Sequence, residues 1–220
     1  MQTRGTMPQP APHSLPSHLR RRIVGGLAAT LATPLLIRDA LAQESLRPTP
    51  AQTEGPFYPV ALPADTDFDL LAQGPLRYTR GAPTWLTGTV TDTTGRPLRG
   101  AMVEIWQCDQ QGHYHHPGDG GAADAAFQGF GRVAVAADGS YRFRTIRPAA
   151  YAGRTPHIHV KVKLAQRELL TTQLYVEGDS GNASDFLWRR LGVADRAAIT
   201  VPFQPGTDGL QARFALVVNA

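Results

Sequence analysis

Short runs of alternating apolar and polar residues recur along the chain from residue 85 onward, separated by residues that favour turns. These runs cover 85–91, 101–107, 132–146, 157–164, 169–176, 200–203 and 212–218. Because neighbouring side chains of a strand point to opposite faces of a sheet, the alternation predicts strands. Many short strands with turn signals between them predict an all-β fold, a two-sheet β-sandwich with long irregular loops.

Turn residues between the runs predict which strands are neighbours. We expect 85–91 and 101–107 to form one hairpin, of the kind found in transthyretin-like sandwiches. We expect 132–146 to form a second hairpin around Asp138-Gly139, because Asp-Gly favours a tight turn between two strands.

The second half of the chain predicts two further pairings. The run 169–176 is expected to pair with 157–164. The runs 200–203 and 212–218 are expected to close the domain around the Gly-Thr-Asp-Gly turn at 206–209.

A single helical pattern interrupts the strands. Ser184–Leu191 is expected to form one short helix, with Asn182 or Ser184 as its N-cap and Gly192 as its end. We expect the chain to divide into a leader, 1–42, an irregular Pro-rich segment, 43–84, and a β-sandwich domain, 85–220, which holds the candidate functional residues described below.

The first 42 residues resemble a cleavable export signal. Three arginines, Arg20–Arg22, precede an apolar run, Ile23–Ile37, and Ala40-Leu41-Ala42 has the small-x-small pattern of a cleavage site. The apolar run has 15 residues, fewer than the ~20 needed to cross a bilayer, so we expect no membrane span after cleavage. The arginines are similar to those of twin-arginine leaders, although the usual residues around them are absent, and a general secretory signal stays open. We expect a periplasmic or extracellular protein.

The charge distribution argues against a nucleic-acid partner. The formal net charge of +4 comes from the leader, because residues 43–220 carry equal numbers of basic and acidic side chains. A surface that binds phosphates needs an excess of Lys and Arg on one face. Lys161 and Lys163 come nearest to a basic run, and we expect both to be exposed and solvated. The one cysteine, Cys108, is expected to be a small buried apolar residue.

Five of the seven histidines gather in two clusters, and each cluster has a tyrosine nearby. His157 and His159 alternate along one strand, so their imidazoles leave the same face of the sheet side by side. The other cluster consists of His113, His115 and His116. Tyr114 lies within this cluster, and Tyr151 shortly precedes His157. Imidazoles and phenolates are suitable ligands for ferric iron, and the pattern therefore predicts a metal site. A solvent-facing strand with two histidines is the alternative.

Ordered motifs from about Thr53 to Val218 resemble the intradiol ring-cleavage dioxygenases, the catechol and protocatechuate enzymes. The matching segments are 54–58, 100–107, 112–114, 131–132, 138–148, Tyr151, 154–159 and 173–179. The resemblance implies a mononuclear non-haem Fe(III) bound by Tyr114, Tyr151, His157 and His159. It also implies that the substrates are a small aromatic diol of the catechol type and O2.

The same resemblance implies roles for further residues. Tyr151 would leave the metal when the catechol binds and would accept one of its protons. Arg154 would stabilise charge that develops on the ring, and Gln173 would form hydrogen bonds within the pocket. Pro56, Phe57 and Tyr58 would line the mouth of the pocket. The ring would open between the two hydroxyl-bearing carbons to give a muconate-type dicarboxylate.

The identity of the catechol and the oligomeric state stay open. Between Tyr151 and His157 the loop is shorter than in protocatechuate enzymes, and Gly153 replaces a bulky aromatic residue, which predicts a wider pocket. Two other readings also stay open at this point. One is an exported non-catalytic β-sandwich that binds a partner, and the other is a periplasmic sandwich that binds copper or zinc through the five histidines.

Overall fold

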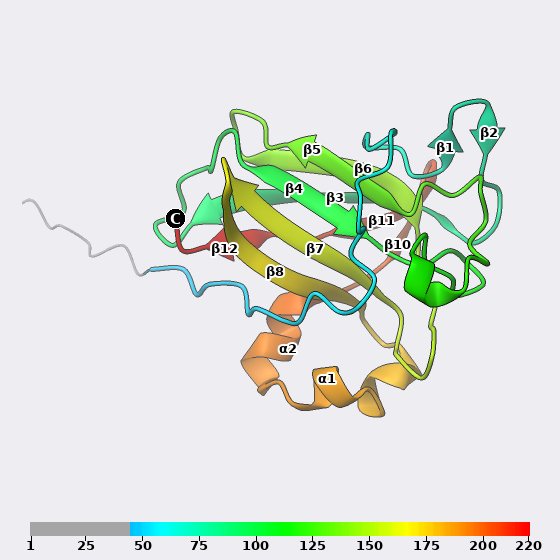
Figure 1. The fold of residues 1–220 in the computed structure, drawn as a ribbon. Helices are drawn as coiled ribbons and strands as arrows, with labels where there is room; N and C mark the ends of the chain where they lie inside the picture. Colours follow the sequence, from blue (N-terminus) through cyan, green and yellow to red (C-terminus); the bar gives the residue numbers. More distant parts are fainter. Residues whose placement is uncertain (1–44) are drawn as a thin grey trace, which may run out of the picture. The chain divides into compact units, whose positions relative to one another are not determined.

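The computed structural model describes residues 45–220 and shows two five-stranded sheets packed face to face, which confirms the predicted β-sandwich (Figure 1). The first sheet contains β10 (Gln204–Gly206), β11 (Gly209–Arg213), β3 (Pro83–Asp92), β12 (Leu216–Val218) and, paired with β3, β6 (Ser140–Ile146). The second has the order β5 (Phe130–Ala134), β4 (Met102–Trp106), β7 (His157–Leu164), β8 (Arg167–Val176) and β9 (Thr200–Val201). The predicted leader lies outside the described residues, and the predicted domain boundaries stay predictions.

The main hydrophobic core fills the space between the two sheets. Each sheet contributes alternate apolar residues that are fully buried: Leu86, Val90 and Phe143 from the first sheet, and Val103, Ile105, Ile158, Val160 and Val162 from the second. Burial of each such side chain stabilises the fold by roughly 1.5–3 kcal/mol. The alternation in β7 therefore sends Ile158 and Val160 into this core and sends His157 and His159 to the opposite face.

That opposite face of the second sheet is covered rather than solvated. Residues 45–58 cross it, and in Figure 1 this blue-to-cyan segment follows β8. The backbone amide of Gln52 donates to the Thr171 carbonyl at 2.8 Å, and the side-chain Nε2 of Gln173 donates to the Thr53 carbonyl at 2.9 Å. His157 and His159 are consequently buried, each only 1% exposed.

The prediction that Lys161 is exposed was wrong. Its side chain is buried beneath the N-terminal segment, where Nζ forms ion pairs with Glu54 and Glu168 and lies 4.0 Å from the Tyr58 ring centre. Lys163 is partly buried and pairs with the buried Glu104 at 3.0 Å. The zero formal net charge of residues 43–220 does not reveal that these two lysines pair with glutamates on a covered face of the sheet.

Both predicted early hairpins were also wrong, although their strands exist. β3 pairs with β6, β11 and β12, whereas β4 pairs with β5 and β7 in the other sheet. Likewise β5 and β6 lie in different sheets, so the turn at Asp138-Gly139 carries the chain from one sheet to the other. Alternation reveals that a strand has a buried face, but it does not reveal the strand's neighbours.

The later strands agree better with expectation. β8 pairs antiparallel with β7, as predicted, with His159 opposite Gln173 and His157 opposite Tyr175. The turn at 206–209 joins β10 to β11. β9 instead pairs in parallel with β8, and the predicted strand 212–218 is divided into β11 and β12.

The helices are short, most of them follow β8, and their boundaries differ from the prediction. η1 (Pro117–Asp119) precedes β5, while η2 (Ser180–Ala183), α1 (Phe186–Arg189) and α2 (Val193–Ile199) come after β8. Asp185 is the N-cap of α1, and Gly192 begins α2 rather than only ending a helix. Two short strands, β1 (Ala72–Gln73) and β2 (Leu76–Arg77), form a small hairpin. Among residues 45–220, no helix has both the length and the apolar character needed to span a bilayer.

Candidate metal and catalytic site

The four predicted metal ligands come together on the covered face of the second sheet. His157 and His159 leave β7 with their Nε2 atoms 3.2 Å apart. Tyr114 and Tyr151 come from separate loops, and their rings lie 5.0 Å apart, centre to centre. The Tyr151 ring is 5.4 Å from the ring of His157, and that of Tyr114 is 6.2 Å from the ring of His159. Two phenols and two imidazoles thus surround one small region.

Hydrogen bonding and burial hold both imidazoles in a form that can bind a metal. His157 Nδ1 lies 2.7 Å from the Thr155 carbonyl oxygen, which only accepts, so Nδ1 carries the proton and Nε2, which faces His159 Nε2, carries the lone pair. Burial lowers the pKa of His157 to about 4. Burial, followed by the nearby charges of His157 and Arg154, lowers the pKa of His159 as well. Both rings are therefore neutral at pH 7.

The two tyrosines are affected differently by burial and by hydrogen bonding. Burial raises the pKa of Tyr114, and it also raises the pKa of Tyr151, where Tyr114 and Arg154 act in the opposite direction. Within residues 45–220, Tyr114 Oη and His159 Nδ1 are buried without a hydrogen-bond partner. A buried polar atom without a partner costs about 1–3 kcal/mol, so a cation that binds the Tyr114 oxygen would remove a penalty.

The loop histidines take no part in this cluster. His115 Nε2 contacts the backbone carbonyls of Asp124 and Phe127, and His116 Nδ1 accepts from the Gly118 amide. His113 Nδ1 lies 3.5 Å from Asp119. Among the described residues, no three His, Cys, Asp or Glu side chains are placed to hold a metal, so a site here requires the tyrosines.

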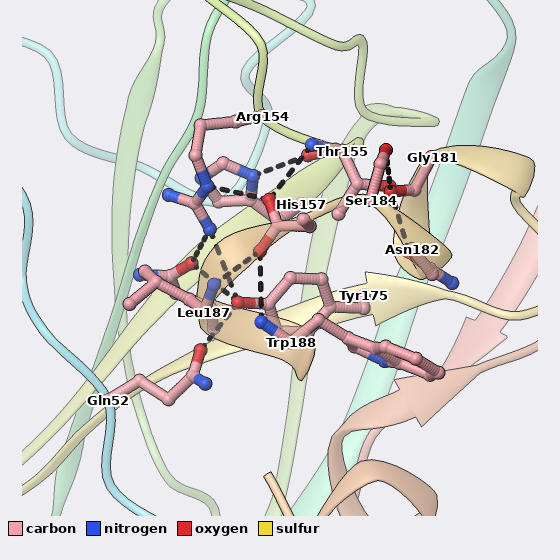
Figure 2. Close-up of polar contacts among 12 residues, drawn as sticks. Gln52, Arg154, Thr155, His157, Tyr175, Gly181, Asn182, Ser184, Leu187 and Trp188 are labelled. Carbon is pink, nitrogen blue, oxygen red and sulfur yellow. Dashed lines mark hydrogen bonds and ion pairs between the residues drawn. The ribbon is translucent and has the colours of Figure 1, made fainter. Parts of the chain in front are cut away.

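Arg154 is held beside the cluster by a buried network rather than in a surface ion pair. Its Nε donates to Asp185 at 2.7 Å, and its Nη2 donates to Gln173 Oε1 at 2.7 Å and to Tyr175 at 3.3 Å. The Arg154 side chain is 10% exposed and that of Asp185 is fully buried. Figure 2 shows Arg154 among these polar contacts, with Gln52 joining them through Tyr175 at 2.7 Å.

Asp185 and Tyr175 are residues of this network that the sequence reasoning missed. Asp185 accepts from Arg154 and Thr155 through one carboxylate oxygen, and its other oxygen caps α1 by accepting from the Leu187 and Trp188 amides. An N-cap signal was available in the sequence, since Asp185 directly precedes the apolar Phe-Leu-Trp run. Tyr175 could have been found from its position two residues after Gln173, on the same face of β8.

The predicted pocket-mouth residues divide between two places. Phe57 stacks on the Tyr114 ring at 4.7 Å and meets the Tyr151 ring edge-on at 5.9 Å. Tyr58 instead packs against Trp106, and its hydroxyl donates to Glu104 at 2.9 Å. Pro56 is exposed. Only Phe57 of the three therefore touches a predicted metal ligand through its ring.

Gly153 lies in the tight turn between Tyr151 and Arg154, where the Arg154 amide donates to the Tyr151 carbonyl at 2.7 Å. Its φ of +76° favours glycine, and a Cβ atom at this position would meet no other atom within 4 Å. Cys108 is buried as predicted, and burial raises the pKa of its thiol to about 12.

Comparisons with known proteins agree with this geometry. A family model described as Dioxygenase matches residues 53–195. The chain is 30% identical over 190 residues to a catechol 1,2-dioxygenase from Acinetobacter baylyi, covering 77% of this chain and 60% of that protein. It is 37% identical over 134 residues to a protocatechuate 3,4-dioxygenase beta chain from Burkholderia cepacia, covering 56% of each.

Solved structures give the same result. The dioxygenase domain of a dioxygenase carbohydrate-binding protein fusion from Streptomyces sp. SirexAA-E has a TM-score of 0.64 and 31% identity, covering 79% of this chain and 99% of that domain. The chain spans 60% or less of the length of the curated relatives it matches. The family match covers more than half of the chain and includes all four predicted ligands. This protein belongs to the intradiol ring-cleavage dioxygenases.

Proposed function

We propose that the protein is a non-haem Fe(III) dioxygenase that opens the ring of a catechol-type substrate between its two hydroxyl-bearing carbons. The convergence of Tyr114, Tyr151, His157 and His159 carries this proposal. Two neutral imidazoles and two phenols that become phenolates form a donor set suited to ferric iron, because hard anionic oxygens stabilise the ferric state. Zinc and copper sites more often use additional His, Cys or carboxylate ligands, which the described residues do not bring together here.

The four donors fit the metal on structural grounds. The buried Tyr114 oxygen has no partner among residues 45–220, and the His157 Nε2 lone pair faces the same region. When bound, the ferric ion would act as a Lewis acid that draws electron density from a chelated catechol. Hydrogen bonds to the far side of the ligands, such as that between His157 Nδ1 and the Thr155 carbonyl, would fix the orientation of the ligands.

The protein's own groups then have distinct tasks. Tyr151 is the most exposed of the four donors, so its oxygen is best placed to accept a proton from a substrate hydroxyl. The Arg154 guanidinium would stabilise negative charge on the ring and its oxygens. Gln173 uses Oε1 to hold Arg154 and Nε2 to hold the Thr53 carbonyl, so we assign it to positioning rather than to contact with the substrate.

The substrate class follows from the relatives and from the ring-lined surroundings of the site. The matched proteins are named as catechol, hydroxyquinol and protocatechuate dioxygenases. The three compounds in these names share two adjacent hydroxyl groups on an aromatic ring. Phe57 beside Tyr114 would contact the face or edge of such a ring. We propose O2 as the second substrate, a muconate-type dicarboxylate as the product, and a role in the breakdown of aromatic compounds.

We also propose that residues 1–42 direct the protein out of the cytoplasm, on the basis of the arginine run and the Ala-Leu-Ala motif before Gln43. N-terminal sequencing of the secreted or periplasmic protein should find a start near Gln43. Recovery of the intact chain from the cytoplasm alone would oppose this assignment.

A visible spectrum tests the iron site. The iron-loaded protein should be red to burgundy, because tyrosinate transfers charge to ferric iron. Tyr114→Phe and Tyr151→Phe should each shift or weaken this band, whereas Tyr141→Phe should leave it unchanged, because the Tyr141 hydroxyl bonds only the Phe214 carbonyl in the core. If the iron-loaded protein stays colourless, or if Tyr141→Phe alters the band as strongly as the other two changes, the assignment fails.

A further inference from the structure

A small cavity lies beside Tyr114. It has a volume of about 100 Å³ and is lined by Phe57, Gln73, Trp106, Tyr114, His115, Gln128 and Phe130, together with Gly129 and with Pro59, Ala61 and Pro63. Among the described residues that line it there is no Asp, Glu, Lys or Arg. The cavity shares Phe57 and Tyr114 with the proposed catalytic site, whereas Tyr151, His157, His159 and Arg154 do not line it.

Unpaired polar atoms are concentrated around this cavity. Within residues 45–220, five buried side-chain atoms have no hydrogen-bond partner, and Tyr114 Oη, one of them, is already assigned to the proposed metal. Three of the other four belong to residues that line the cavity: Gln73 Oε1, Trp106 Nε1 and Gln128 Oε1. Because nearly all buried polar groups in proteins are hydrogen-bonded, such a concentration indicates a bound molecule that satisfies them together.

The chemistry of these atoms is fixed by their surroundings. Gln128 Nε2 donates to the Phe130 carbonyl at 2.8 Å and to the Asp67 carbonyl at 3.3 Å. Both partners only accept, so the orientation of the Gln128 amide is settled and Oε1 is the atom left to accept. The Trp106 indole nitrogen can only donate. The cavity therefore presents an N–H donor and at least one amide oxygen.

We infer that this cavity binds a small cluster of water molecules that joins Trp106 to Gln128 and Gln73. A water molecule accepts one hydrogen bond from the indole and donates two to amide oxygens, which matches the unpaired atoms. The cavity is large enough for several water molecules, since one needs roughly 10–15 Å³ of this kind of volume. An apolar guest would leave the polar atoms unpaired. An ion would find no Asp, Glu, Lys or Arg among the lining residues, and the Nε2 of His115 already contacts the Asp124 and Phe127 carbonyls.

The cluster would link two parts of the protein that are far apart in the sequence. Gln73 belongs to the small β1–β2 hairpin, whereas Trp106 ends β4 and stacks on His159, with ring centres 4.8 Å apart and planes within 8°. Water held between them would fix the edge of the indole and, through the stack, the position of the His159 ring. This assignment does not depend on the presence of iron.

The test is a high-resolution crystal structure of the metal-free protein and of its Gln73→Met variant. The wild-type protein should show waters within about 2.7–3.2 Å of Trp106 Nε1 and Gln128 Oε1. Gln73→Met should lose the water next to position 73 and keep those at Trp106 and Gln128. Gln204→Met, which changes an exposed glutamine on β10, should keep all of them.

A measurement in solution covers the case in which the variant does not crystallise or fold. The Trp106 indole proton of the wild-type protein should show magnetisation transfer with bound water, unlike the indole of Trp188, which donates to Thr200 at 3.1 Å. A dry cavity, or density for a molecule other than water, would overturn the assignment. So would a Trp106 indole without contact to water. None of these outcomes bears on whether the protein cleaves catechols.

Discussion

His159→Leu is expected to lose bound iron and to lower kcat/KM by more than about 100-fold. Mutation of a residue that only orients a metal ligand typically costs about 10–100-fold, and loss of the ligand itself should cost more. Leucine is apolar and of comparable size, and the imidazole that it replaces has a buried Nδ1 without a partner among residues 45–220. The change removes this unpaired atom, which favours the variant, and also removes the contact between His159 Nε2 and His157 Nε2, which opposes it. The free energy of unfolding of the metal-free protein should therefore change by only about 1 kcal/mol.

Iron content, steady-state kinetics and denaturant unfolding of the metal-free protein measure the three parts of this result. His113→Leu is the matched control, because the His113 ring contacts Asp119 in the loop rather than the four donors. It should retain iron and activity. A His159→Leu protein that binds iron stoichiometrically and turns over normally would remove His159 from the site.

Asp185→Asn is expected to cause the largest loss of stability, about 3 kcal/mol or more. Asp185 is fully buried and carries the only carboxylate that the described structure places on Arg154. Removing one partner of a buried pair leaves the other charge uncompensated, at a typical cost of about 3–5 kcal/mol. For a domain of this size, the melting temperature should fall by roughly 6–12 °C. The kcat/KM value should fall as well, because Arg154 loses its fixed position.

The effect of Asp185→Asn should depend on pH in a defined direction. Burial alone would raise the pKa of Asp185, but hydrogen bonds from Arg154 and from the Trp188 and Thr155 amides outweigh it and lower the pKa. A lowered pKa in the folded state means that the charged form stabilises the fold above the ordinary Asp pKa of about 4. The difference in stability between wild type and variant should be complete at neutral pH and should shrink as the pH falls below about 4.

Asp195→Asn provides the control for Asp185→Asn. Asp195 pairs with Arg47 at 2.7 Å, but the Arg47 side chain is 58% exposed. Exposed pairs contribute about 0–1 kcal/mol, so this change should have little effect at any pH. Equal losses of stability from the two changes would show that Asp185 acts only as a surface charge.

The sequence was most informative where chemistry and strand periodicity coincide. The period of two in His157–Leu164 correctly placed Ile158 and Val160 on the face opposite His157 and His159. Family motifs brought Tyr114 and Tyr151 to the same site, although they lie on loops whose paths no local pattern reveals. The convergence of the four side chains depends on how the second sheet is covered, which periodicity does not describe.

The errors arose where long-range partners decide the structure. β3 and β4 were correctly located, but their partners come from distant parts of the chain, so the predicted hairpin between them was wrong. The sequence pattern predicts that Lys161 is solvated, because it does not show that the segment 45–58 places Glu54 against it. Asp185 was assigned to a helix interior, whereas its position at the N-cap is what lets one carboxylate hold both α1 and Arg154.

Labelled oxygen tests the proposed reaction most directly. The iron-loaded protein should be given catechol under 18O2, and the acyclic product should be analysed by mass spectrometry. We expect consumption of one O2 per catechol and a muconate-type dicarboxylate that contains oxygen from O2, with both atoms retained apart from exchange with water. Oxidation of catechol to a quinone without ring opening, or a ring-opened product whose new oxygens come only from water, would contradict the assignment of this protein as an intradiol dioxygenase.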